Sequence, residues 1–294
     1  MDKISLIIPC FNERNSIEKT IEEANFLLGK VLYEIIVVDD GSFDGTSEIL
    51  KNRPDIKLLR NPYNKGYGFS IKKGIIAATG DIVAITDADG TYPIESILLM
   101  VKKLEEGYDM VIGKRENLKN LDPVIKRLSR FFFKILAEFV AGEKILDTNS
   151  GLRVFRRNVI AKYMMDTSSG FSFSLSTTLI FILEGLSVYY YPIEYKQRIG
   201  KSKIKYFRDI LRSAQILIET IAFYNPLKLF MLVSVKITVL GLIVLLVSMV
   251  TDLLSVSLGI VCCAILLGLS LFTFSLGLIA SILKKRARVK NETN

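Results

Sequence analysis

The stretch 34-EIIVVDDGS-42 decides the fold of the N-terminal part of this chain. Four consecutive β-branched residues followed by a turn sequence predict a short buried strand that ends at Asp39. The segment Lys3–Pro9 has the same apolar character, and Ser16–Leu28 between the two strands has helical periodicity. A second helix is expected at Thr46–Lys51, after the turn. Strands and helices therefore alternate from the first residues onward.

The alternation continues along the chain. Further strands are expected at Ile56–Arg60, Ile82–Thr86 and Met110–Gly113, and further helices at Lys72–Ala78 and Ile94–Glu106. This order predicts an α/β fold with a doubly wound, largely parallel sheet. Ligands of such sheets bind beyond the carboxyl ends of the strands. Acidic residues are concentrated at these predicted ends, namely Glu13, Asp39, Asp40, Asp87 and Asp89.

Two long apolar runs, 227–250 and 256–283, dominate the C-terminal part of the chain. A helix of about 23 residues is roughly 35 Å long at ~1.5 Å per residue, enough to cross a hydrocarbon layer of ~30 Å. Lys236 is the single charge inside the first run, and we expect it to snorkel or to face a partner. The two runs predict a hairpin of membrane-spanning helices.

The net charge of +9 is divided unevenly along the chain. Residues 1–227 carry a net charge of only +4, which argues against a nucleic-acid-binding module. Basic clusters flank the hairpin on both sides, at 201–212 and at 284–290, whereas the connecting loop has none. Because cytoplasmic flanks are enriched in Lys and Arg, we expect both termini and the N-terminal domain on the cytoplasmic side.

The chain contains no histidine and three cysteines, Cys10, Cys262 and Cys263. The absence of histidine excludes Ser-His-Asp and Cys-His catalysis and every histidine-based metal site. Three cysteines are too few for a disulfide framework or a zinc cluster. The segment 66–68 lacks the full GxGxxG fingerprint, and no Walker lysine loop is present. A Rossmann dehydrogenase and an NTP hydrolase are therefore both disfavoured.

Asp87 and Asp89 follow an apolar predicted strand and are separated by Ala88. In an extended chain, residues two apart point to the same side, so the two carboxylates can converge. A hard divalent cation prefers such ligands and completes its shell with substrate phosphates. An N-cap role of Asp89 before a helix explains one of the acids but not both. Asp39-Asp40-Gly41-Ser42 has the same ambiguity between a site and a turn.

Several motifs, taken jointly, resemble those of the family 2 glycosyltransferases of the GT-A fold. They are 7-IIPCFNE-13, 37-VVDDGSFDGT-46, 64-NKG-66, 87-DAD-89, 113-GKR-115, 147-DTNSG-151 and 198-RIGKSK-203. Within that family the chain looks most like the polyprenyl-phosphate sugar synthases, including the dolichyl-phosphate mannose synthases, over residues 3–205. Two-span anchors also occur in such enzymes.

The resemblance implies a role for individual residues. The nucleotide base and ribose would be held by Pro9, Phe11, Glu13, Val38 and Asp40, with Asp39 close by. Asp87 and Asp89 would hold Mg²⁺ or Mn²⁺ against the donor diphosphate, and Ala88 would add a backbone contact. Arg115 and either Lys126 or Arg127 would meet the acceptor phosphate. Arg198, Ser202 and Lys203 would close over the donor phosphates.

The hypothesis is an inverting, metal-dependent transfer of a hexose from a nucleotide sugar to a membrane polyprenyl (dolichyl or undecaprenyl) phosphate. The second pKa of a phosphate monoester is near ~6, so this acceptor needs no general base. The donor is of the GDP-mannose or UDP-glucose type, and self-association is left open. One alternative is transfer to a hydroxyl group of a lipid-linked glycan or polysaccharide. Another is an inactive membrane scaffold.

Four segments are expected in the chain. They are a cytoplasmic glycosyltransferase domain at 1–205, a juxtamembrane amphipathic helix at 206–226, the hairpin at 227–283 and a basic tail at 284–294. A second basic amphipathic helix is expected at 124–140, where it would carry its cations to the headgroup layer.

Overall fold

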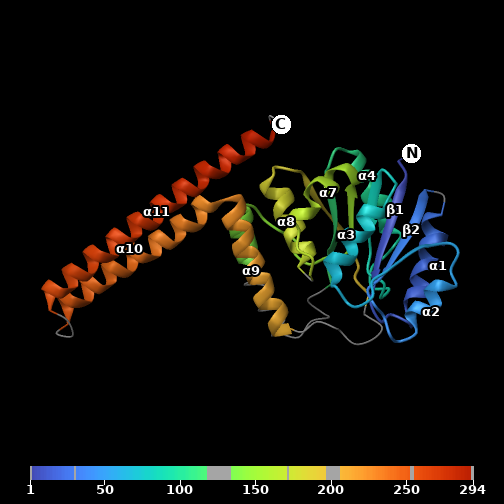
Figure 1. The fold of residues 1–294 in the computed structure, drawn as a ribbon, viewed down its shortest axis with the longest axis horizontal. Helices are drawn as coiled ribbons and strands as arrows, with labels where there is room; N and C mark the ends of the chain where they lie inside the picture. The colour runs from blue at the N-terminus through green and yellow to red at the C-terminus, as the bar shows by residue number, and fades with distance from the viewer. Residues whose placement is uncertain are drawn as a thin grey trace. The chain divides into compact units, whose positions relative to one another are not determined.

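The computed structural model describes residues 2–29, 31–117, 134–170, 172–196, 206–251 and 255–292. The chain divides into two compact units, Met1–Leu217 and Ile218–Asn294 (Figure 1).

The described part of the first unit alternates strands and helices. The strands are β1 (Ile4–Cys10), β2 (Leu32–Asp39), β3 (Lys57–Arg60), β4 (Ile82–Ile85), β5 (Met110–Arg115), β6 (Arg153–Arg156) and β7 (Val188–Ile193). The helices are α1 (Ile17–Leu28), α2 (Thr46–Lys51), α3 (Tyr67–Ala77), α4 (Ser96–Glu105), α7 (Arg157–Tyr163) and α8 (Phe173–Leu183), with a 3-10 turn at Met164–Asp166. The helix α9 (Tyr206–Tyr224) ends in the second unit.

The strands form one mixed sheet in the order β3-β2-β1-β4-β6-β5-β7. Its first four strands are parallel, and β5 is parallel to β7. Strand β6 runs antiparallel to both of its neighbours, β4 and β5. The α/β fold with a largely parallel, doubly wound sheet is therefore confirmed, with one reversed strand that the sequence did not indicate.

Helices cover both faces of the sheet, because alternate residues of each strand point to opposite sides (Figure 1). On β1, Leu6 and Ile8 pack into a core with residues of α1, α2 and α4. Ile7, which lies between them, packs into a second core with residues of α3, α7 and α8. Strands buried on both faces explain the unbroken apolar runs from which they were predicted.

Helix α3 begins at Tyr67, five residues before the expected start at Lys72. Its first turn is held by a distant loop: the N–H of Gly68 donates to the carbonyl of Gly170 (3.1 Å) and that of Phe69 to the carbonyl of Ser169 (2.8 Å). A Cβ atom on Gly68 would overlap the carbonyl of Ser168. Gly68 is thus required for close approach of two backbones.

The second unit contains the two long apolar helices α10 (Pro226–Val250) and α11 (Val256–Glu292). Helix α10 begins with a proline at its first position, and the Asn225 side chain caps it by accepting from the N–H of Lys228 (3.2 Å). By length and composition, Pro226–Val250 and Val256–Arg286 are each able to cross a membrane. This agrees with the expected pair of spans.

Small and polar residues join α10 to α11. The Ser234 hydroxyl donates to the carbonyl of Ser270 (3.0 Å), and a Cβ atom on Gly259 would overlap the Ser248 side chain. Such close contacts are typical of helices that associate in a bilayer. Lys236 is exposed on α10. Of the amphipathic helix expected at 124–140, residues 134–141 are helical, and 124–133 lie outside the described residues.

Candidate active site

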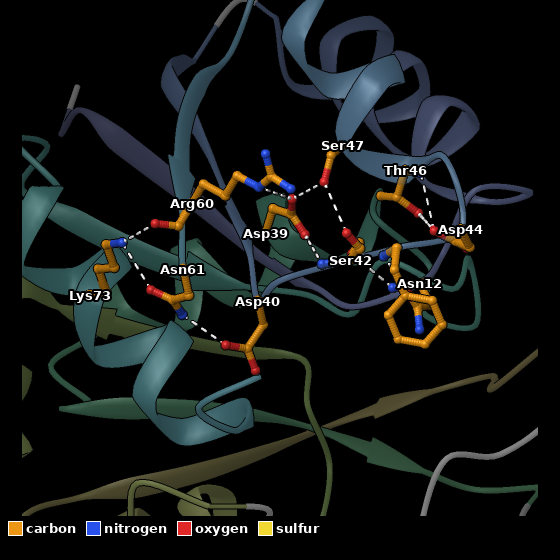
Figure 2. A network of polar contacts seen from close by, with 11 residues as sticks. Asn12, Asp39, Asp40, Ser42, Asp44, Thr46, Ser47, Arg60, Asn61 and Lys73 are labelled. Carbon is orange, nitrogen blue, oxygen red and sulfur yellow. Dashed lines mark hydrogen bonds and ion pairs between the residues drawn. The ribbon is translucent and has the colours of Figure 1, made fainter. Parts of the chain in front are cut away.

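Asp39 is completely buried at the end of β2, where it braces the turn that leads to α2 (Figure 2). Its Oδ1 accepts from the N–H of Ser42 (2.9 Å) and its Oδ2 from the hydroxyl of Ser47 (2.5 Å). Arg60 Nε lies 3.5 Å from Oδ2 and supplies the compensating charge. The Asp39 carboxylate is thus occupied with holding its own turn.

Asp40 holds the segment that follows β3 (Figure 2). Its Oδ1 accepts from Asn61 Nδ2 (2.8 Å) and from the N–H of Lys65 (2.9 Å), and its Oδ2 accepts from the N–H of Gly66 (2.9 Å). An ionised carboxylate offers about four acceptor positions. Three donors of this protein therefore occupy most of the acceptor positions that Asp40 could present to a nucleotide.

The loop after β1 is joined to the loop after β2. The N–H of Asn12 donates to the Ser42 hydroxyl (2.9 Å), and Asn12 Oδ1 accepts from the N–H of Phe43 (2.9 Å). Asn12 has a φ of 54°, a left-handed conformation that asparagine tolerates better than most residues. The arrangement brings the ring of Phe43, which is 83% exposed, to 5.9 Å from that of Phe11.

The other residues expected at the nucleotide lie nearby but differ in exposure. Pro9 and Val38 are paired in the register of β1 and β2, and both are buried. Glu13 is half-buried, and its N–H donates to the Thr46 hydroxyl (3.0 Å). Only part of the expected set therefore presents side chains at the surface.

Asp87 and Asp89 follow β4 closely, as expected. Asp87 is half-buried, and its Oδ1 accepts from the hydroxyl of Tyr67 (2.9 Å). Asp89 is 5% exposed, and its Oδ1 accepts from the hydroxyl of Thr91 (2.6 Å) and from its N–H (3.2 Å). Helix α4 begins only at Ser96, so Asp89 forms a local turn and is not an N-cap. Ala88, between the acids, is buried.

Tyr195 lies beside Arg115, whose guanidinium carbon is 5.4 Å from the centroid of the Tyr195 ring. Burial raises the pKa of Tyr195 most, the charges of Asp89 and Asp87 raise it further, and Arg115 lowers it. The sequence did not indicate Tyr195, because it is far from the acids along the chain.

A second tyrosine, Tyr92, packs edge-on against the ring of Tyr195 at 5.1 Å. Its hydroxyl accepts from the N–H of Gly151 (2.7 Å), and burial is the main cause of its raised pKa. Tyr92 lies three residues after Asp89, which is the one signal in the sequence that could have pointed to it.

Arg115 forms a buried, two-point ion pair with Asp147. Arg115 Nε and Nη2 each lie 2.8 Å from a carboxylate oxygen of Asp147, and the two side chains are 8% and 6% exposed. Burial alone would raise the pKa of Asp147, but the charge and hydrogen bonds of Arg115 hold it below its ordinary value. The pair joins the end of β5 to the 147–151 segment.

The donor set fits a divalent cation of the kind that shares its shell with substrate. Among the described residues, no group of three or more His, Cys, Asp or Glu side chains forms a complete protein cage. Mg²⁺ is usually bound through one or two protein carboxylates plus substrate phosphates. Asp87 and Asp89 can supply the carboxylates. Room for the carboxylate of Asp87 is made by Gly151, where a Cβ atom would come within 2.7 Å of Oδ1.

The remaining expected residues lie outside the described residues. They are Lys126 and Arg127, expected at the acceptor, and Arg198, Ser202 and Lys203, expected over the donor phosphates.

Comparisons with known proteins agree with this architecture. Mycobacterium tuberculosis glucosyl-3-phosphoglycerate synthase, solved with phosphoglyceric acid, is similar in fold, with a TM-score of 0.61 at 20% identity over 74% of this chain and 80% of that one. The same enzyme, solved with Mn²⁺, UDP and glucosyl-3-phosphoglycerate, gives a TM-score of 0.59 at 20% identity, over 76% of this chain and 80% of that one.

Relatives in sequence span most of the chain. An uncharacterized protein of Methanocaldococcus jannaschii is 33% identical over 72% of this chain and 90% of its own length. A dolichyl-phosphate hexose transferase of Haloferax volcanii is 27% identical (70% and 88% covered). An undecaprenyl-phosphate 4-deoxy-4-formamido-L-arabinose transferase of Yersinia pestis is 31% identical (81% and 73% covered). The model of glycosyl transferase family 2 matches residues 5–164, and the chain therefore belongs to that family, on a GT-A fold.

Proposed function

We propose that this chain transfers a hexose from a nucleotide sugar to the phosphate of a membrane polyprenol, with inversion at the anomeric carbon. Two relatives are named for transfer to dolichyl or undecaprenyl phosphate. The observation that carries the proposal is the pair of carboxylates, Asp87 and Asp89, after β4 in a chain that also has two apolar helices able to cross a membrane.

In this proposal Asp87 and Asp89 hold Mg²⁺ or Mn²⁺. When bound, the ion would neutralise charge on the departing nucleoside diphosphate. The chain's own part is to keep the two carboxylates in place, through Tyr67 at Asp87 and Thr91 at Asp89. Arg198, Ser202 and Lys203 are proposed to close over the donor phosphates.

The nucleotide is proposed to bind over the loops after β1 and β2. Phe11 and Glu13 would meet the base and ribose above the buried Pro9 and Val38. Asp39 and Asp40 would then act mainly by shaping these loops, since their carboxylates already have partners in the protein.

The acceptor phosphate is itself the nucleophile. With a second pKa near ~6, it is mostly dianionic at neutral pH, so a chain without histidine can serve it. What the protein must provide is positive charge to hold and orient the anion. We assign this to Lys126 or Arg127, with Arg115 beside them, whose guanidinium is already paired with Asp147.

The membrane arrangement belongs to the same proposal. Residues 1–205 form the catalytic domain, 206–226 lead into the hairpin 227–283, and 284–294 form a basic tail. Basic residues at both ends of the hairpin favour the side on which cytoplasmic nucleotide sugars are available.

The test is a transfer assay with the full chain in detergent. Donors of the GDP-mannose and UDP-glucose types are offered with polyprenyl phosphate and Mn²⁺, and Asp89→Asn should lower kcat/KM by about 10²-fold or more. Asp55→Asn, which removes a surface partner of Arg53, is the matched control and should be near normal. Transfer to a glycan hydroxyl but not to polyprenyl phosphate would favour the alternative acceptor.

A further inference from the structure

Tyr67 connects two parts of the site that are distant in sequence. It is the first residue of α3, and its hydroxyl donates to Oδ1 of Asp87 (2.9 Å), twenty residues further along the chain. The ordinary pKa of a phenol is about 10, so the Tyr67 hydroxyl is a hydrogen-bond donor at neutral pH.

The backbone on the N-terminal side of Tyr67 is fixed by Asp40. The N–H groups of Lys65 and Gly66 both donate to that carboxylate, each at 2.9 Å. Gly66 has a φ of 105°, a conformation open mainly to glycine, so the peptide can turn its N–H groups toward Asp40.

The backbone on the C-terminal side of Tyr67 is fixed as well. The N–H groups of Gly68 and Phe69 donate to the carbonyls of Gly170 and Ser169. Tyr67 thus stands between two fixed peptides, and its ring packs against the second core.

We propose that Tyr67 is a positioning residue that orients the Asp87 carboxylate toward a divalent cation bound with a nucleoside diphosphate, and that Asp40 fixes Tyr67 through the Lys65–Gly66 peptide. This inference rests on the proposed function. It makes one connected brace from the end of β2, through the start of α3, to the end of β4.

The physical basis is the orientation of a ligand by its hydrogen bond. A carboxylate that accepts from a fixed donor at one oxygen has a defined plane, and its other oxygen has a defined direction. Loss of such supporting partners typically costs about 10- to 100-fold in metal affinity or activity. Tyr67→Phe removes only the hydroxyl and keeps the ring that packs against the second core.

The first test measures Mn²⁺ affinity by the EPR signal of the free ion, with the full chain in detergent and saturating UDP or, separately, GDP. Tyr67→Phe should weaken Mn²⁺ binding about 10-fold with an unchanged melting temperature. Tyr108→Phe, at a ring that packs on Tyr189, is the control and should bind like the wild type. Wild-type affinity in Tyr67→Phe would overturn the proposal.

The second test separates the brace from direct nucleotide contact by Asp40. If Asp40 acts through Tyr67, Asp40→Asn weakens Mn²⁺ binding. The double variant with Tyr67→Phe should then have the same Mn²⁺ affinity as whichever single variant binds the ion less tightly. Additive losses, with weaker UDP or GDP binding in the absence of Mn²⁺, would overturn the Asp40 step.

The outcome for the proposed function is read from the wild type alone. If the wild type fails to bind Mn²⁺ in the presence of UDP and also in the presence of GDP, and transfers no sugar, the proposed function is contradicted. If the wild type binds Mn²⁺ and transfers sugar, and Tyr67→Phe binds Mn²⁺ equally well, only the positioning role of Tyr67 is contradicted.

Discussion

The backbone of Gly151 lies directly against the carboxylate of Asp87: a methyl group at position 151 would come within 2.7 Å of Oδ1 and 2.9 Å of Oδ2. The alanine variant must therefore push the carboxylate away. A displacement of about 1 Å can cost about 10²-fold in rate. We therefore expect Gly151→Ala to lower kcat/KM by about 10- to 100-fold in the transfer assay.

The control for this variant is Gly268→Ala in α11, where an added Cβ meets nothing within 4 Å. It should retain full activity. Normal transfer by Gly151→Ala would show that Asp87 tolerates displacement, and would weaken its assignment as a metal ligand.

Removing Asp147 should destabilise the fold. Asp147→Ala leaves the Arg115 guanidinium buried without its carboxylate, and breaking a buried pair in this way typically costs about 3–5 kcal/mol. Thermal unfolding of the purified chain measures the effect. Glu106→Gln, which breaks the exposed pair with Lys103, should change stability far less. Equal losses in the two variants would contradict the assigned strength of the buried pair.

The same pair predicts a dependence of stability on pH. The pKa of Asp147 in the folded chain lies below its ordinary value, so folding is favoured at pH values above the unfolded pKa of about 3.9 and this contribution is lost as the pH falls through the folded pKa. The melting temperature of the wild type should fall in this acidic range. The melting temperature of Asp147→Asn should fall less steeply with decreasing pH. An equal slope in the variant and the wild type would exclude Asp147 as the source.

The hairpin offers a test that does not depend on catalysis. Gly259→Leu places a whole side chain where even an added Cβ atom would overlap the Ser248 side chain, so α10 and α11 must separate. We expect a lower melting temperature in detergent and weaker cross-linking of cysteine pairs across the two helices. Gly268→Leu on the same helix is the control, and a similar loss there would point to a general effect of added bulk.

The sequence predicted those parts of the fold that depend on local pattern. The strands ending at Cys10 and Asp39 and the helix Thr46–Lys51 follow from apolar runs and a turn within a few residues of one another. The reversed direction of β6 and the early start of α3 depend instead on pairing with distant segments. No periodicity in one stretch of sequence contains that information.

The candidate site divides in the same way. Asp87 and Asp89 could be found because two acids at a strand end form a local signal. The donor to Asp87, Tyr67, comes from twenty residues earlier, and the partner of Arg115 lies thirty-two residues later. Such partners become visible only when the chain is folded.

The occupied carboxylates of Asp39 and Asp40 have a consequence for how a ligand is captured. The loops that they hold are ordered by the protein's own donors, so the conformational entropy of arranging this end of the sheet is lost during folding and not during association. If a nucleotide binds there, as proposed, it would meet a surface already ordered by these hydrogen bonds, and its binding free energy would not be spent on ordering that surface.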